Sequence, residues 1–169
     1  MILSDKDIVE ALAYEGLRII PGPIDECIQP CSVDLHLFKE LKTLGGKSID
    51  LSKDSYKLKP KEFILGSTEE YVEIPSHLCG QVEGRSTIAR NGIMIHITSG
   101  FIDAGYNGNI TLEIFNASDR EYELEWGSSI CQIVFHRLSS PCLREYGDES
   151  LGSKYQGSEG TVGAKYYVE

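Results

Sequence analysis

Residues 84–118 contain side chains from which a site for an anionic ligand could be built. Gly84 is followed directly by Arg85, Ser86 and Thr87, and Arg90 comes three residues later. A glycine lets the backbone approach a ligand, a helix start favours anions, and guanidinium groups fork onto phosphate oxygens. The GxxxxGK[ST] pattern of a Walker loop is not present here. The alternative is a capped helix with two surface arginines.

Glu113 is the one carboxylate in the run 110–115. By strand alternation it shares a face with Thr111 and Phe115. On the solvent face of an amphipathic strand it would have no chemical role. In a pocket, its pKa would rise and it could take a proton from water. Taken alone, Asp103, two residues before Gly105 in the loop 100–108, is explained as a turn-forming residue.

The histidines and cysteines do not form the pattern of a zinc site. Zinc-dependent base deaminases carry H-x-E and P-C-x-x-C. Pro30-Cys31 and Pro141-Cys142 each lack the second cysteine, and none of the histidines is followed by Glu at the second position. The five cysteines are odd in number and scattered, which indicates buried thiols rather than a disulfide framework. We therefore expect no zinc and a cytoplasmic location.

The elements that must position these residues are mostly β-strands. A helix is expected from Ser4 to Gly16, followed by period-two alternation around Val33 and Leu35. Short β-type runs then recur between proline and glycine breaks, at 62–65, 71–74, 93–98, 110–115, 122–126 and 130–138. Residues 86–90 predict a second, short helix. This pattern is typical of a mostly β sandwich or distorted barrel.

Composition limits the partners. The chain has 169 residues, a formal net charge of −10 and a pI near 4.9. One domain of this size can bury a substantial core. The acidic balance argues against nucleic acid and against an anionic membrane surface. A polyanionic ligand would therefore need local positive charge or a divalent cation.

The C-terminal residues differ from the rest. Residues 151–163 read LGSKYQGSEGTVG, with four glycines around Lys154 and Gln156. Such a segment is either a flexible tail or a lid that orders over a ligand. We divide the chain into a β-domain, residues 1–150, and a tail, residues 151–169.

Taken in order, these motifs resemble the dCTP deaminase family of the dUTPase superfamily, and within it the bifunctional, dUMP-forming kind. The resemblance covers most of the chain: residues 4–8, 29–35, 84–90, 98–108, 111–113, Gln132, Tyr146 and 153–157. It implies a distorted β-barrel or jelly-roll of the dUTPase type with a glycine-rich C-terminal lid. It also implies a homotrimer with active sites between subunits.

The resemblance further implies residue roles. Asp103 would bind the 3′-hydroxyl, Tyr106 would pack on the sugar, and Glu113 would be the catalytic carboxylate. The implied catalytic set is Glu113, Asp103, Arg90 and Ser86. The implied substrate-binding set adds Arg85, Thr87, Ile88, Ala89, Tyr106, Thr111, Leu112, Gln132, Tyr146, Lys154 and Ser158.

The implied reaction is hydrolytic deamination of dCTP at cytosine C4 without zinc, with Mg²⁺ held by the nucleotide phosphates. Gly100-Phe101 matches the loop of the dUMP-forming kind, whose product would supply thymidylate synthesis. Two departures are Ser99, where the family usually has alanine, and Ser158, where it usually has glutamine. The alternatives are a monofunctional deaminase that releases dUTP, a dUTP pyrophosphatase that retains Glu113, and a silent nucleotide sensor. Inhibition by dTTP is a further expectation.

Overall fold

The computed structural model describes residues 1–23 and 25–166, so the last three residues of the predicted tail lie outside the described residues. The chain begins with helix α1 (Asp5–Tyr14), as expected from the sequence. Ser4 caps it in a reciprocal hydrogen-bonded pair with Asp7, which satisfies amide groups that the first turn leaves unpaired. Ile8 and Ala11 are buried, so one face of the helix packs against the β-structure. Within the described residues, no helix is long and apolar enough to cross a bilayer.

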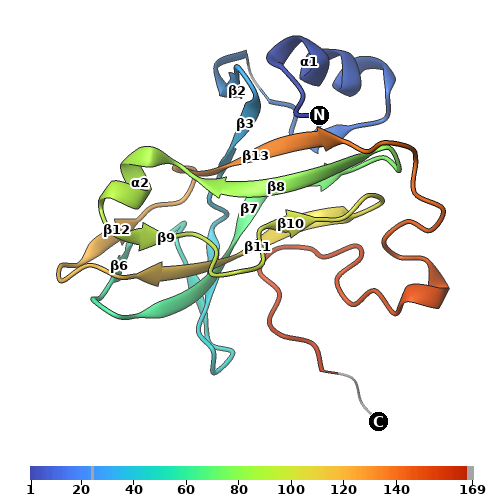
Figure 1. The fold of residues 1–169 in the computed structure, drawn as a ribbon. Helices are drawn as coiled ribbons and strands as arrows, with labels where there is room; N and C mark the ends of the chain where they lie inside the picture. The colour runs from blue at the N-terminus through green and yellow to red at the C-terminus, as the bar shows by residue number, and fades with distance from the viewer. Residues whose placement is uncertain (24, 167–169) are drawn as a thin grey trace.

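Two larger sheets make up the body of the protein (Figure 1). The five-stranded sheet has the order β10 (Phe101–Ile102), β8 (Leu78–Gly84), β13 (Ser129–Arg137), β3 (Ser32–His36) and β2 (Ile28–Gln29). The six-stranded sheet has the order β5 (Ser48–Asp50), β4 (Glu40–Lys42), β7 (Phe63–Glu73), β11 (Asn107–Asn116) and β9 (Ile93–Met94), and β1 (Arg18–Ile20) also pairs with β7.

Smaller elements complete the chain. Strands β12 (Tyr122–Leu124) and β6 (Tyr56–Leu58) form a separate two-stranded sheet. The predicted short helix is present as α2 (Ser86–Arg90), at the end of β8 (Figure 1). Two 3-10 turns, η1 (Asp25–Cys27) and η2 (Glu149–Leu151), lie before β2 and in the C-terminal segment.

One hydrophobic core joins the two larger sheets. Leu35 and Ile133 contribute from the five-stranded sheet, and Ile64 and Leu112 contribute from the six-stranded sheet, all without exposed area. Apolar burial of this kind is the main favourable term in folding. The mostly β prediction is confirmed. The two sheets remain separate in the described residues and do not close into a continuous barrel.

Two details of the strand prediction were wrong. The runs 62–65 and 71–74 belong to one strand, β7, because the polar residues between them, such as Thr68 and Glu70, are buried within the sheet. The run 93–98 is a strand only over β9. Beyond it, the amide of Ile97 donates to the carboxylate of Glu113 instead of to a strand partner.

The alternation predicted for the strand carrying Glu113 is confirmed. Buried and partly exposed residues alternate without a break along β11. Leu112 and Ile114 therefore enter the core, whereas Thr111 and Glu113 lie on the opposite face. The period of two thus sets the direction in which the carboxylate points.

Candidate active site

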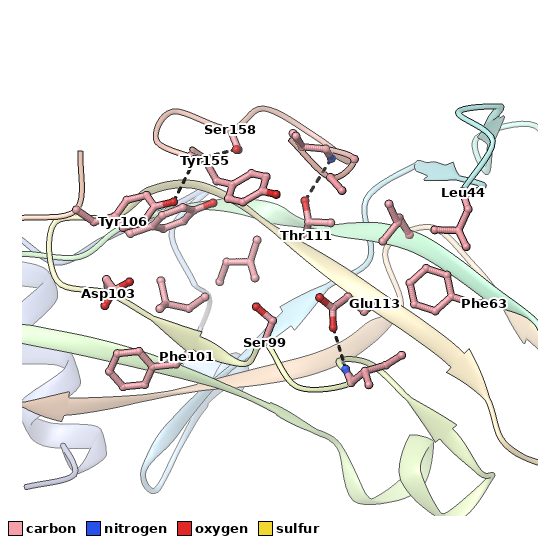
Figure 2. Close-up of a pocket in the computed structure, with 18 residues that line it drawn as sticks. Leu44, Phe63, Ser99, Phe101, Asp103, Tyr106, Thr111, Glu113, Tyr155 and Ser158 are labelled. Carbon is pink, nitrogen blue, oxygen red and sulfur yellow. Dashed lines mark hydrogen bonds between the residues drawn. The ribbon is translucent and has the colours of Figure 1, made fainter. Parts of the chain in front are cut away.

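Glu113 faces a cavity of about 590 Å³ (Figure 2). The walls come from β11, from the start of β7, from the turn after β4, from the chain between β9 and β11, which includes β10, and from the C-terminal segment. They consist of Leu44, Phe63, Leu65, Ile97, Ser99, Phe101, Ile102, Asp103, Tyr106, Ile110, Thr111, Glu113, Tyr146, Tyr155, Ser158, Val162, Gly163 and Ala164. Most of these side chains are apolar or aromatic, and a few polar groups converge among them, which is the usual composition of a small-molecule site.

The carboxylate of Glu113 is held from one side. Its Oε2 accepts a hydrogen bond of 3.0 Å from the backbone amide of Ile97, and the amide of Glu113 itself donates to the carbonyl of Ile95. Side chain and backbone of one residue therefore fix the segment after β9 against β11. This hydrogen bond to one oxygen fixes the orientation of the carboxylate in the cavity, as a general base requires. Figure 2 shows Ser99 beside it.

Asp103 and Tyr106 lie at the other end of the cavity (Figure 2). Tyr106 is buried, its hydroxyl donates to the carbonyl of Asn109 at 2.8 Å, and its ring packs against Tyr146 with centroids 5.7 Å apart. Burial is the main cause that raises the pKa of Tyr106, so its hydroxyl stays protonated. The aromatic pair is a fixed, mainly apolar surface. Asp103 is exposed on the loop beside it.

The C-terminal segment closes the cavity along β11. Ser158 forms a parallel bridge with Gly108, and the amide of Val162 donates to the hydroxyl of Thr111 at 3.2 Å. A Cβ at Gly108, whose φ is 150°, would lie 2.7 Å from the hydroxyl of Tyr106 and 3.0 Å from the amide of Ser158. The absence of a side chain at Gly108 therefore permits this approach. Thr161 has no exposed area, so the segment is also anchored by burial.

Lys154 lies in a second cavity of about 570 Å³ that shares walls with the first. Asp103, Phe101, Tyr146 and Tyr155 belong to both. Arg144 lines this second cavity as well, so it contains two cationic side chains beside the aromatic pair.

The loop predicted to govern bifunctionality is tightly packed at its glycine. A Cβ on Gly100 would lie 2.9 Å from the carbonyl oxygen of Val82 and 3.0 Å from the ring of His96. A side chain at this position would therefore displace the loop. Its neighbour Phe101 is 60% exposed and lines both cavities, so this short stretch shapes the wall between them.

The cationic stretch 85–90 lies elsewhere on the chain. It follows β8, and Ser86, Thr87, Ala89 and Arg90 are exposed. The guanidinium of Arg85 forms an ion pair with Asp34 at 3.1 Å and donates a hydrogen bond to the carbonyl of Ser129 at 3.4 Å. Among the described residues that line the two cavities, none comes from this stretch, and Gln132 is also outside them.

The predicted site residues thus fall into two groups. The cavity group contains Asp103, Tyr106, Thr111, Glu113, Tyr146 and Ser158, with Lys154 next to it. The cradle group, residues 85–90 with Gln132, lies apart from it on one chain. Leu112 belongs to neither group, because its side chain is buried in the hydrophobic core. The hydroxyl of Ser158 donates to the carbonyl of Tyr155, so it stabilises the segment itself.

Sequence reasoning missed the apolar walls. Ile97 is 45% exposed inside a run read as a strand, and Leu44 lies in a turn between β4 and β5. Phe63 and Leu65 alternate along β7 like ordinary sheet residues. Nothing in their spacing distinguishes a cavity wall from a surface, because that distinction depends on which other segments lie opposite.

Comparison with known families agrees with this geometry. Residues 2–138 match the family model described as dCTP deaminase-like. The chain belongs to the dCTP deaminase-like family. The prediction of this family is therefore confirmed, and the match includes both β11 with Glu113 and the cationic stretch.

Full-length relatives carry a common name. Proteins named "dCTP deaminase, dUMP-forming" are 42% identical in Methanosphaera stadtmanae, over 94% of this chain and 90% of the relative, and 41% identical in Halobacterium salinarum, over 95% and 92%. The Corynebacterium jeikeium protein of the same name is 37% identical over 99% of this chain and 98% of its own length.

Solved structures show the same fold. The 2′-deoxycytidine 5′-triphosphate deaminase of Agrobacterium tumefaciens has a TM-score of 0.68 at 22% identity, covering 85% of this chain and 49% of its own, so this chain spans about half of that one. The dUTPase of Staphylococcus bacteriophage 80alpha has a TM-score of 0.56 at 20% identity, covering 78% of this chain and 96% of its own.

In the described residues, no group of three or more His, Cys, Asp or Glu side chains lies close enough together to hold a metal ion.

Proposed function

We propose that this protein hydrolyses dCTP to dUMP, pyrophosphate and ammonia, and that Glu113 is its catalytic carboxylate. The observation that carries the proposal is a single oriented glutamate in a cavity of nucleotide size, in a chain whose full-length relatives are named for this reaction.

The deamination step can be assigned to Glu113. The carboxylate takes a proton from a water molecule, and the water oxygen bonds to C4 of cytosine. The carboxyl group gives this proton to N3. It then transfers the proton of the new C4 hydroxyl to the amino group, the C4–N bond breaks and ammonia leaves, so cytosine and water become uracil and ammonia. The amide of Ile97 keeps the carboxylate oriented through both transfers. The enclosing apolar walls limit access of bulk water.

The second step cleaves the bond between the α- and β-phosphates with another water, which releases pyrophosphate from the uracil nucleotide. Asp103 would bind the 3′-hydroxyl and Tyr106 would pack on the sugar, both close to Phe101 in the wall. Lys154 and Tyr146 line the second cavity, where the phosphates would extend from the sugar. The bound Mg²⁺ would neutralise phosphate charge, and its preference for phosphate and water oxygens suits entry with the nucleotide.

Shared sites in a homotrimer would unite the two groups of residues. On one chain the cavity holds Glu113 and Asp103, while Ser86 and Arg90 are exposed on a separate surface. A cyclic arrangement brings one surface of each subunit against a different surface of the next. Residues 85–90 of one subunit would thereby hold the phosphates of a nucleotide whose base lies in the neighbour's cavity. A cytoplasmic location and inhibition by dTTP at the same site remain predictions.

A product assay tests the proposal. The protein is incubated with dCTP and Mg²⁺, and ammonia, dUTP, dUMP and pyrophosphate are followed over time. We expect ammonia, pyrophosphate and dUMP in equal amounts. Accumulation of dUTP without pyrophosphate would identify a monofunctional deaminase. Release of pyrophosphate from dUTP, without ammonia from dCTP, would identify a dUTP pyrophosphatase.

A further inference from the structure

Strand β3 presents three polar side chains at alternating positions, Ser32, Asp34 and His36. We call them the β3 polar row. Ser32 and Asp34 are buried, at 4% and 7% exposure, although polar side chains of this kind are usually exposed. Each member of the row binds a side chain of another strand or loop. The partners are Gln132, Arg85 and Glu70, respectively.

Two of these partners belong to the cradle group. The guanidinium of Arg85 reaches from the end of β8 across β13, where Nη1 donates to the carbonyl of Ser129, to Asp34 on β3, where Nη2 pairs with Oδ2 at 3.1 Å. A guanidinium has further N–H donors in a fixed fork, so this pairing orients the group without consuming it.

Gln132 is held in a similar way. The hydroxyl of Ser32 donates to its Oε1 at 2.9 Å, and its Nε2 donates to the carbonyl of Gly84 at 3.4 Å. Asp34 and Gln132 are paired residues in the β3–β13 register, so the two contacts lie side by side on the sheet. The oxygen of the amide is thus occupied, and its NH₂ group is directed toward the start of the cationic stretch.

We propose that Ser32 and Asp34 are positioning residues that hold Gln132 and Arg85 ready for the triphosphate. This inference rests on the proposed function, since it takes these two residues as phosphate ligands. An arginine that is already oriented loses less rotamer freedom when the anion binds. The third member, His36, is hydrogen-bonded to Glu70, which belongs to neither group of site residues.

Electrostatics and positioning predict opposite signs for a change at Asp34. If the carboxylate acted only as a negative charge near the phosphates, its removal would tighten triphosphate binding. If it orients Arg85, its removal weakens triphosphate binding and leaves the affinity for a ligand without phosphates unchanged. The ratio of dCTP affinity to deoxycytidine affinity therefore separates the two effects.

The experiment measures both affinities by calorimetry, with Mg²⁺ present, in chains that also carry Glu113→Gln to prevent turnover. For Asp34→Asn we expect dCTP affinity to fall about tenfold at unchanged deoxycytidine affinity. For Ser32→Ala, which removes a contact of one neutral hydroxyl, we expect a fall of about threefold. Asp34→Glu, which restores the charge, should recover part of the loss.

A matched control is Glu15→Gln. Glu15 pairs with Arg137 at 3.0 Å, the same kind of contact as that between Asp34 and Arg85, but at the end of α1 and away from both groups of site residues. It should leave the affinity ratio unchanged. Unchanged or tighter dCTP binding in Asp34→Asn overturns the inference, as does an equal loss for deoxycytidine. If the protein without substitutions showed no activity toward dCTP, the proposed function itself would be rejected.

Discussion

The cavity and the cradle are built in different ways. The cavity is enclosed by its own chain: β11, the preceding loop and residues 155–164 surround Glu113, and backbone hydrogen bonds fix both the carboxylate and the closing segment. The cradle residues Ser86 and Arg90 are exposed on a helix of five residues, with one arginine paired internally. One region is a cavity lined by several segments of one chain, whereas the other is an exposed surface.

The comparison suggests a division of work. Under the proposed function, chemistry on the base depends on excluding water and on a fixed carboxylate, and both would come from a single chain. Binding of the phosphates depends on cations, which can be provided across an interface because charge acts at longer range than a proton transfer. Four changes would break or sharpen this division.

The largest effect is expected from Glu113→Gln. The amide keeps the size of the side chain and an oxygen that can accept from Ile97, but it cannot take a proton from water. We expect deamination to fall by at least about 100-fold while dCTP affinity changes by a few-fold. Ammonia release and equilibrium binding check the two parts. More than a tenth of the original deaminase activity would contradict the assignment.

Changing Arg85 or Arg90 to Ala should act on the phosphates alone. Each charge-assisted contact to phosphate is worth about 1.5–3 kcal/mol, so dCTP affinity should fall by about tenfold to about 100-fold. Deoxycytidine affinity should stay the same because the cavity is untouched. Equal losses for both ligands would show that the cradle assignment is wrong.

Opening the closing segment should lower turnover without unfolding the sheets. Truncation after Ser150 removes every contact of this segment with β11, and Gly108→Ala weakens them because the added Cβ meets Tyr106 and Ser158. We expect turnover of dCTP to fall about tenfold in Gly108→Ala, and further in the truncated chain.

The control for this change is Gly127→Ala. Gly127 also has a positive φ, of 72°, but nothing lies within 4 Å of an added Cβ. It should therefore show the cost of backbone strain in thermal stability without the loss of turnover. If both alanine variants lose turnover equally, the contact with the segment is not the cause.

The smallest expected effect comes from mixing two variants, which tests whether the cavity of one subunit and the cradle of its neighbour form one site. Glu113→Gln chains and Arg90→Ala chains are unfolded together, refolded as a mixture and assayed at a low dCTP concentration, at which each variant alone shows almost no turnover. If each site combines the two residues from neighbouring subunits, about a quarter of the sites contain neither substitution, and about a quarter of the original activity returns. If both residues act within one subunit, the mixture stays inactive. Size measurements by light scattering check that all samples have the same assembly state.

Local patterns were sufficient where one strand or helix decides the outcome. The alternation along 110–115 correctly placed Glu113 and Thr111 on the face opposite to the core, and the cap at Ser4 marked the start of α1. The resemblance, read from motifs, gave the family. The short strands β1, β2, β4, β5, β6 and β10 were not predicted, because two or three residues carry little periodic signal; β12, equally short, was found only within the longer run 122–126.

Contacts between distant segments could not be read in this way. The role of Ile97 as a donor to Glu113 depends on where the chain turns after β9, and the pairing of Asp34 with Arg85 depends on the order β8-β13-β3 in the sheet. The prediction of one strand over 93–98 was wrong for the same reason: the amide of Ile97 donates to the side chain of Glu113 instead of to a backbone carbonyl. The buried polar row on β3 had the spacing of an ordinary strand.

The sequence alone determined the mostly β class, the acidic balance, the concentration of arginines at 85–90 and the face on which Glu113 lies. These follow from residue type and from periods of two or a few residues, which act over short distances in the chain. Only the tertiary structure decided that Glu113 lies in a cavity, that residues 155–164 close it, and that the arginines lie apart from it. Those outcomes depend on long-range sheet order and packing, in which segments far apart in sequence must fit one another.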